Sequence, residues 1–150
     1  MKPLIVLVGT FVGALLVLRL IQGSFQTAFA ARIAMAVMLI FTAIGHFAFT
    51  EGMAAMLPTF IPFKTFMVYF TGILEIAFGV GILIPAFRPL VGWIIIAFFI
   101  LLLPANIKAA LENLNYQTGV YDGPGIVYLW FRIPLQLLFI VWVYFSVVRS

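Results

Sequence analysis

The sequence predicts an all-α membrane protein, a bundle of about five transmembrane helices. Hydrophobic residues make up 66% of the 150 residues, and charged residues make up only 8%. A water-soluble domain of this length needs far more polar surface than that. The apolar residues gather in five runs, each near the roughly 20 residues that an α-helix needs to cross a ~30 Å hydrocarbon core. No run alternates polar and apolar residues with period two, which disfavours a β-barrel.

The predicted spans run approximately from Pro3 to Ile21, Ile33 to Phe49, Phe66 to Ile84, Leu90 to Ala110, and Ile126 to Val148. Lys2 before the first run resembles the start of a signal peptide, and Ala28-Phe29-Ala30 resembles a cleavage site. The run is nevertheless close to spanning length, and Arg19 interrupts any short signal core. We therefore expect a helix that is retained.

The connections differ in character. Gln22 to Ala31 is predicted to be a short polar link, and Pro85 to Pro89 a tight turn. Thr50 to Lys64 is apolar but broken by two prolines, so we expect it to lie in the membrane interface. Asn113 to Gly125 is the most polar segment and ends in a strong turn signal.

Basic residues near the span ends predict the orientation of the chain. Five spans place four arginines on one side: Arg19, Arg32, Arg88 and Arg149. The other side receives Lys2, Lys64 and Lys108, together with Glu51, Glu112 and Asp122. The positive-inside rule counts basic residues only, so it favours the arginine side as cytoplasmic, with the N-terminus outside and the C-terminus inside. We expect a bacterial-type cytoplasmic (inner) membrane.

Several classes of chemistry are excluded by composition. The chain has no cysteine and one histidine, which removes disulfides, thiol redox chemistry, iron–sulfur ligation and a haem held by two histidines of one chain. The formal charge of +4 comes from eight basic residues scattered between apolar runs, whereas a nucleic-acid surface needs them clustered. We predict no nucleic-acid partner, no metal site and no cofactor within the chain.

Glu75 is the clearest candidate for a functional residue. An ionisable residue at the centre of a span costs about 2.5–3.5 kcal/mol on insertion scales, and it is functional by default. Glu75 lies near the middle of the third span, and spacings of three and four residues place Gly72 and Gly79 on the same helix face. Small residues let a neighbouring helix approach closely, so this face is predicted to point into the bundle.

Three further spans contribute polar side chains. His46 lies near the end of the second span, with Thr42 one turn before it, and Asn106 lies in the fourth. Arg132 and Gln136 lie four residues apart on one face of the last span. Counting along the chain places these groups at compatible depths in one half of the membrane. The predicted pocket opens to the non-cytoplasmic face and is formed by five candidate ligand-binding residues: His46, Glu75, Asn106, Arg132 and Gln136.

Two further expectations concern this pocket. Arg132 has a long side chain that can reach towards the level of Glu75, so we expect the two to share one network, directly or through water or a ligand. The loop from Asn113 to Gly125 is predicted to cover the mouth. Its candidate lid residues are Tyr116, Tyr121 and Asp122. The alternative is a structural ion pair that only fixes how the helices dock.

The same polar positions lie in stretches that resemble the DoxX family of small membrane proteins. The matching stretches are Gly45-His46-Phe47, the Pro58–Pro62 segment, Thr71-Gly72 through Glu75 to Ile84-Pro85, Leu103-Pro104-Ala105-Asn106, and Phe131-Arg132-Ile133-Pro134-Leu135-Gln136. The likeness covers roughly Arg32 to Arg149. It implies a DoxX-like four-helix domain in residues 32–150, preceded by an additional N-terminal transmembrane helix and linker in residues 1–31.

The DoxX family takes its name from a small subunit associated with a quinone-reducing thiosulfate oxidoreductase. The resemblance therefore implies a membrane subunit of a redox-linked system that binds a quinone or a similar lipid-soluble molecule, with electrons supplied by a partner redox protein. Membrane lipid and a second copy of the chain are further partners that it allows. Two alternatives stay open: a non-catalytic partner that assists assembly of another protein, and a small-solute transporter. No catalytic residue is assigned, and the sequence leaves open whether the chain is an enzyme.

Overall fold

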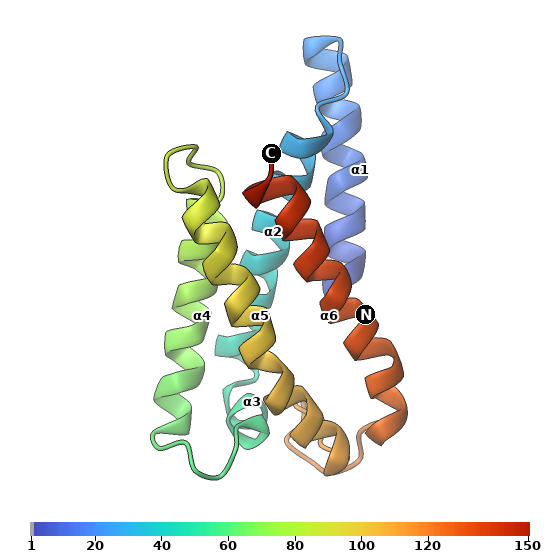
Figure 1. Cartoon of the computed structure of the whole chain (residues 1–150). Coiled ribbons are helices and arrows are strands. Elements are labelled where there is room, and N and C mark those ends of the chain that lie inside the picture. Colours follow the sequence, from blue (N-terminus) through green and yellow to red (C-terminus); the bar gives the residue numbers. More distant parts are fainter. Residues whose placement is uncertain (1) are drawn as a thin grey trace.

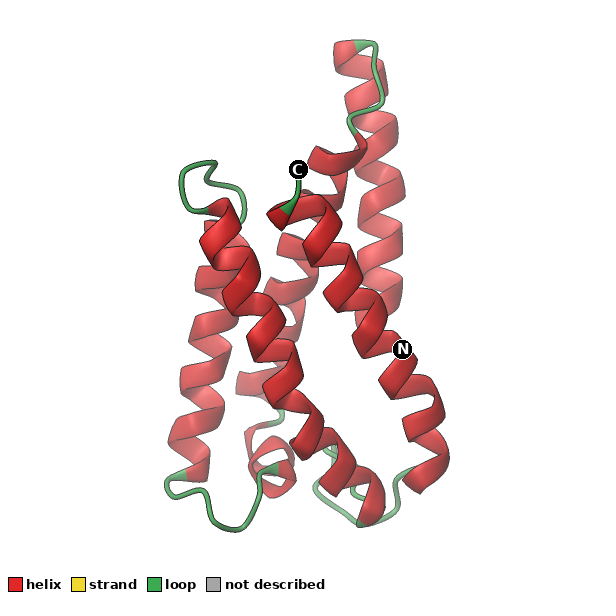
Figure 2. Ribbon diagram, viewed as in Figure 1, coloured by secondary structure: helices red, strands yellow, loops and turns green. Residues whose placement is uncertain are grey.

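The computed structural model describes residues 2–150 and consists of helices joined by turns and loops (Figures 1 and 2). Its helices are α1 (Lys2–Gln22), α2 (Thr27–Ala48), α3 (Thr50–Met56), α4 (Lys64–Gly81), α5 (Arg88–Leu111) and α6 (Leu129–Val143). A 3-10 turn (Gly125–Tyr128) leads into α6, and a π-helical turn (Tyr144–Val148) continues it. Five segments are long and apolar enough to cross a membrane: α1, α2, α4, α5 and the stretch 125–148. The predicted all-α membrane bundle is confirmed.

The start of α2 differs from the prediction. The helix begins at Thr27 rather than at Ile33, and only the short turn around Gly23 separates it from α1. The cause is local, because alanine is the best helix former and three alanines lie between positions 28 and 31. Arg32 therefore lies within α2, whereas the prediction placed it just before the start of the second span.

Figure 1 shows the two ends of the bundle, and the residues at these ends differ in charge. We call one the arginine end: it holds the α1–α2 turn, the α4–α5 turn and the C-terminus, and with them Arg19, Arg32, Arg88 and Arg149. The other, the loop end, holds α3, the connection 57–63 and the loop 112–124. α1 and α4 pack along α2, while α5 packs against α6 and its π-helical continuation.

α1 does not run the full height of the bundle. The ring centroids of Phe11 and Trp142 are 5.1 Å apart, and Trp142 Nε1 donates to the Ala31 carbonyl of α2 at 3.0 Å. Phe11 is thus level with Ala31. Lys2 lies nine positions earlier (11 − 2) on an antiparallel helix, so it is level with about Ile40, roughly 13 Å further along α2. α1 begins part-way along the bundle and projects beyond it at the arginine end (Figure 1), so Lys2 does not reach the loop end, where we predicted it.

The apolar core lies in the half of the bundle nearer the arginine end. Its buried members come from α2 between Ala34 and Leu39, from α5 between Ile95 and Phe99, and from the last span between Leu135 and Val147. The half nearer the loop end holds the polar side chains His46, Asn106 and Arg132. This division agrees with the sequence expectation that the polar side chains lie in one half of the membrane.

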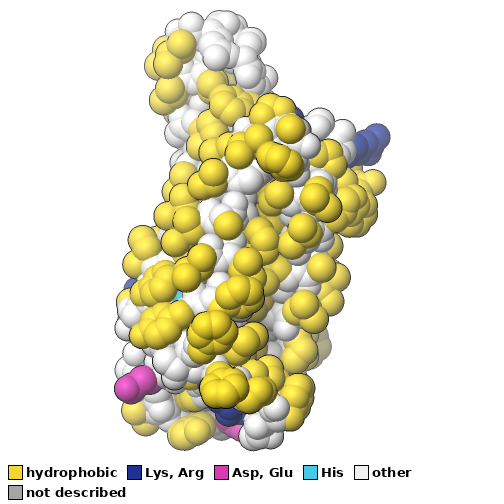
Figure 3. Space-filling model, turned by 90° about the vertical axis from the view of Figure 1, so that its left-hand side faces the viewer, with side chains coloured by type: hydrophobic (Ala, Val, Ile, Leu, Met, Phe, Trp, Pro, Cys, Tyr) yellow, Lys and Arg dark blue, Asp and Glu magenta, His cyan; other side chains and the backbone are white. Residues whose placement is uncertain are grey.

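The outward faces of the helices are apolar as well. Large hydrophobic side chains such as Ile5, Leu101 and Trp130 are 67%, 74% and 82% exposed. Figure 3 shows hydrophobic side chains over most of one face, with charged side chains mainly towards its ends. Water-soluble monomers rarely expose apolar surface of this extent, and lipid is the solvent that suits it. The chain is a multi-pass membrane protein.

Candidate functional site

Small residues bring α4 close to α2 at the predicted site. Gly72, Glu75 and Gly79 are all buried on one face of α4, as the spacing predicted. A Cβ atom at Gly72 would lie only 2.9 Å from His46 Cβ, and one at Gly79 would lie 3.2 Å from the Ala36 carbonyl oxygen. The two backbones are therefore nearly in contact above and below Glu75. This close packing holds the carboxyl group against α2.

The His46 ring lies between α2 and α4, beside the close contact at Gly72. Its Nδ1 lies 2.9 Å from the Val68 carbonyl oxygen, and its Nε2 lies 3.5 Å from Glu75 Oε2. A carbonyl oxygen only accepts, so Nδ1 carries a hydrogen and donates it. Nε2 and Oε2 then hold one proton between them: an imidazolium faces a carboxylate, or a neutral ring accepts from a carboxylic acid. Both forms are neutral as a pair, which lowers the cost of burying a carboxyl that is 3% exposed.

Two threonines extend this pair across the helix interface. Thr42 Oγ1 of α2 lies 2.9 Å from Glu75 Oε2, and Thr71 Oγ1 of α4 lies 3.1 Å from His46 Nδ1. The four side chains form one polar cluster, which we call the His46–Glu75 cluster. Thr42 was singled out from the sequence by its position one turn before His46. Thr71 was missed as a partner, although its place one turn before Glu75 is the signal that could have found it.

The remaining candidates form a second group on α5 and α6. Gln136 is fully buried, and its Nε2 donates to the Phe99 carbonyl at 2.6 Å. Asn106 donates from Nδ2 to the Leu102 carbonyl within its own helix at 2.9 Å. Two buried atoms of this group, Arg132 Nε and Gln136 Oε1, have no hydrogen-bond partner within residues 2–150.

The two groups are not bonded to each other in the part of the chain that the structure describes. Glu75 binds His46 and Thr42, and no hydrogen bond or ion pair joins it to Arg132. The direct form of the predicted Glu75–Arg132 contact is therefore absent from residues 2–150. A connection through water or a ligand stays a prediction. The same residues contain no group of three His, Cys, Asp or Glu side chains that could hold a metal ion.

The loop 112–124 packs against the end of α2 nearest the cluster. The Tyr116 ring lies edge to face with Phe49, at a centroid distance of 6.0 Å, and a Cβ at Gly52 would overlap the Tyr116 carbonyl. Tyr121 and Asp122 are exposed. A polar hollow of about 440 Å³ opens beside this contact, between α3, the start of α4 and the loop. Of the three candidate lid residues, Tyr116 is the one that touches this end of α2, and the lid role stays a prediction.

Five apolar helices with ionisable side chains in their interior define a multi-pass integral membrane protein. Residues 35–147 match the family described as a domain of unknown function (DUF8561), and the chain belongs to this family. No curated protein and no solved structure matches the chain. The matched range contains all five candidate pocket residues and leaves α1 outside. The predicted division after residue 31 falls within α2 and stays a prediction.

Proposed function

We propose that the chain is a membrane subunit of a redox-linked system and binds a quinone or a similar lipid-soluble molecule. One observation carries the proposal: Arg132 Nε and Gln136 Oε1 are buried without a partner in the described residues, one turn apart on α6. Leaving a buried donor or acceptor unpaired costs about 1–3 kcal/mol, and more for a charged group. A bound polar head that accepts from Arg132 and donates to Gln136 would satisfy both.

A quinone head fits this pair of groups. Its carbonyl oxygens accept from a guanidinium, and the hydroxyl groups of the reduced quinol donate to an amide oxygen. A small anion would suit Arg132 but would be repelled by the unpaired oxygen of Gln136, which counts against the transporter alternative. Reduction of a quinone to a quinol takes two electrons and two protons. In this proposal a partner redox protein supplies both electrons, the His46–Glu75 cluster supplies one proton, and water supplies the second proton and restores that of the cluster.

The resemblance to the DoxX family supports the same setting. The residues that carry it include Arg132 and Gln136, and the family's namesake accompanies a quinone-reducing oxidoreductase. The apolar outer faces of α5 and α6 suit the lipid tail of such a molecule, since Leu101 and Trp130 are largely exposed there.

Binding of decylubiquinone to the purified chain in detergent tests the proposal, with quenching of tryptophan fluorescence as the signal. Trp130 lies two positions from Arg132 and reports on this region. We expect saturable binding that Arg132→Gln weakens at least about tenfold, because a hydrogen bond to a charged group contributes about 1.5–3 kcal/mol. Gln136→Leu should also weaken binding. It removes an unsatisfied buried oxygen together with the bond from Nε2 to the Phe99 carbonyl, so circular dichroism is used to check that the variant folds.

Arg19→Gln is the matched control, because Arg19 is an exposed arginine outside the site. Its affinity for the quinone should equal that of the unaltered chain. Absence of saturable binding, or equal affinity in the Arg132 variant, contradicts the proposal. Recovery of the chain with another membrane protein in mild detergent, without quinone binding, would favour the assembly-partner alternative.

We also infer that the arginine end faces the cytoplasm. With Lys2 level with the middle of α2, the basic residues number four at the arginine end against two, Lys64 and Lys108, at the loop end. The positive-inside rule therefore places the C-terminus in the cytoplasm. A reporter protein that functions only in the cytoplasm, fused after Ser150, is expected to be active. Activity of a reporter that functions only outside the cytoplasm would reverse the assignment.

A further inference from the structure

The arginine end carries four basic side chains and no acidic side chain. Of the four acidic residues, Glu51, Glu112 and Asp122 belong to the loop end, and Glu75 lies inside the bundle. The four arginines of the arginine end thus have no acidic side chain beside them. Arg88 is the first residue of α5, where the helix dipole adds further positive charge.

Arg32 and Arg88 are both partly buried at this end of the bundle. Arg32 Nη1 donates to the Ser146 carbonyl at 3.0 Å and to Ser150 Oγ at 2.7 Å. The Nε atoms of both arginines are buried and have no partner within residues 2–150. Partly buried guanidinium groups with unused donors would be stabilised by an anion that accepts hydrogen bonds from them, and phosphate oxygens fit guanidinium geometry.

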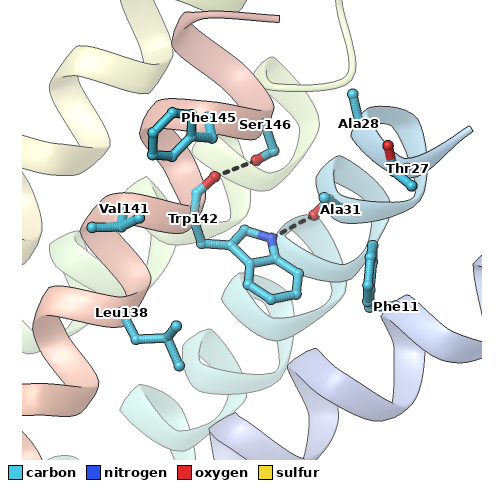
Figure 4. Close-up of a pocket in the computed structure, with 9 residues that line it drawn as sticks. All are labelled: Phe11, Thr27, Ala28, Ala31, Leu138, Val141, Trp142, Phe145 and Ser146. Atoms are coloured by element: carbon cyan, nitrogen blue, oxygen red, sulfur yellow. Dashed lines mark hydrogen bonds between the residues drawn. The ribbon is translucent and has the colours of Figure 1, made fainter.

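An apolar groove lies between α1, α2 and α6 near this end. Its volume is about 310 Å³, and its walls include Phe11, Ala31 and Trp142 (Figure 4). The indole of Trp142 has its one donor satisfied by the Ala31 carbonyl, so the groove presents mainly carbon atoms. An apolar cavity of about 150 Å³ already holds benzene. A groove of this size therefore suits a segment of an acyl chain.

The groove and the arginines touch at two residues. Ser146 lines the groove, and its carbonyl oxygen accepts the bond from Arg32. Phe145 also lines it, and the Arg149 guanidinium lies 5.7 Å from the centroid of that ring. An apolar groove with basic groups at its rim matches a molecule with an anionic head and a hydrocarbon tail.

We propose that this end of the bundle binds an anionic phospholipid, with the headgroup phosphate on Arg32, Arg88 and Arg149 and one acyl chain in the groove. The bilayer itself supplies the ligand, and anionic lipids attract basic groups near the membrane surface. The site lies at the arginine end, away from the His46–Glu75 cluster, and it does not depend on the proposed quinone function.

Native mass spectrometry of the purified chain tests the proposal, with phosphatidylglycerol and phosphatidylcholine of identical acyl chains as probes. We expect phosphatidylglycerol to bind more tightly. Each arginine removed should weaken that preference about fivefold, as expected for about 1 kcal/mol per basic residue. The triple variant Arg32→Gln, Arg88→Gln, Arg149→Gln should lose it. If the triple variant does not fold, Arg149→Gln alone gives the same readout. Arg149 follows the last helical residue, so its replacement should not disturb a helix.

Arg19→Gln is the control of equal charge change. Arg19 is exposed, lies in the last helical turn of α1, which projects beyond the bundle, and donates to the Gly23 carbonyl. It lies outside the proposed headgroup site, so its loss should leave the preference unchanged. Equal binding of the two lipids, a preference that survives the triple variant, or a loss of preference in Arg19→Gln overturns the proposal. Displacement of phosphatidylglycerol by inorganic phosphate would assign the site to a free anion instead of a lipid.

Ala28→Leu tests the acyl-chain half of the site, because Ala28 lines the groove and a larger side chain would fill it. We expect weaker binding of long-chain phosphatidylglycerol and unchanged binding of the dihexanoyl form, whose short chains do not need the groove. Equal effects on both forms, or no effect on either, would remove the groove from the proposal.

Discussion

Replacing His46 by leucine is expected to lower the free energy of unfolding in detergent by about 3–5 kcal/mol, the usual cost of leaving one member of a buried ion pair alone. Glu75 is 3% exposed and would lose the group that shares its proton, keeping Thr42 alone. Glu75→Leu should cost less, because the His46 ring can remain neutral and keeps its bond to Val68. Unfolding by a denaturing detergent, followed by circular dichroism, measures both changes.

The double variant His46→Leu, Glu75→Leu decides whether the two residues act as a unit. Replacing both members of a buried pair by apolar residues of similar volume is often neutral or stabilising, so the double variant should be more stable than His46→Leu alone. Glu75→Gln is the matched control, since a glutamine amide can donate to His46 Nε2 and keeps the shape of the side chain. Simple additivity of the two leucine changes would mean that the pair is not coupled.

The same comparison of two single variants with the double variant, made with Glu75→Leu and Arg132→Met, tests the predicted link between Glu75 and Arg132. The structure joins Glu75 to His46, so changes at Glu75 and Arg132 should add within about 0.3–0.5 kcal/mol. A larger coupling energy would show that water or a ligand links the two groups. If the double variant of Glu75 and Arg132 folds yet loses quinone binding, the link is functional.

Hydropathy and residue spacing predicted much of this molecule. Runs of apolar residues predicted five spans because the bilayer sets the length of a helix. The spacing of Gly72, Glu75 and Gly79 predicted a buried face, because positions three and four apart share one side of a helix. Both predictions depend on properties of a single helix, which a sequence contains directly.

The partner of Glu75 could not be predicted in the same way. Counting residues estimates the depth of a side chain, and by depth Arg132 and His46 were both eligible. Which helix lies beside α4 depends on packing between distant segments, and α2 is the neighbour that packs closely along it. Gly72 and Gly79 permit close approach by a helix, but they do not determine which helix lies there. The pairing of α2 with α4 is therefore information that only the structure supplies.

The position of α1 along the axis of the bundle could not be predicted from the sequence either. α1 is apolar on every side, with Ile5, Leu16 and Leu20 all more than half exposed. A helix that is hydrophobic all round has no polar face that distinguishes the side packed on its neighbour from the side facing lipid. Its position along the bundle is seen only in contacts between distant segments, such as that of Phe11 with Trp142. Arg19 at its far end agrees with a helix that projects beyond the bundle.

Gly72→Ala is expected to destabilise the bundle by about 1–3 kcal/mol, the usual cost of overpacking. The added Cβ would lie 2.9 Å from His46 Cβ and 3.3 Å from a ring carbon of Phe47. A Cβ is fixed to its backbone and cannot rotate away, so α2 and α4 must separate. Alanine gains up to about 1 kcal/mol over glycine in helix propensity, and this gain offsets only part of the loss.

Gly13→Ala is the matched control for that substitution, because Gly13 also lies inside a helix but has nothing within 4 Å of its added Cβ. It should leave stability unchanged or raise it by up to about 1 kcal/mol. Separation of α2 and α4 would also lengthen the 3.5 Å approach of His46 to Glu75. The nitrogen-15 chemical shift of His46 Nε2, which reports whether that atom carries a hydrogen, should therefore change in Gly72→Ala and not in Gly13→Ala. Equal stability of the two variants, with an unchanged His46 signal, would mean that close packing at Gly72 does not hold the pair together.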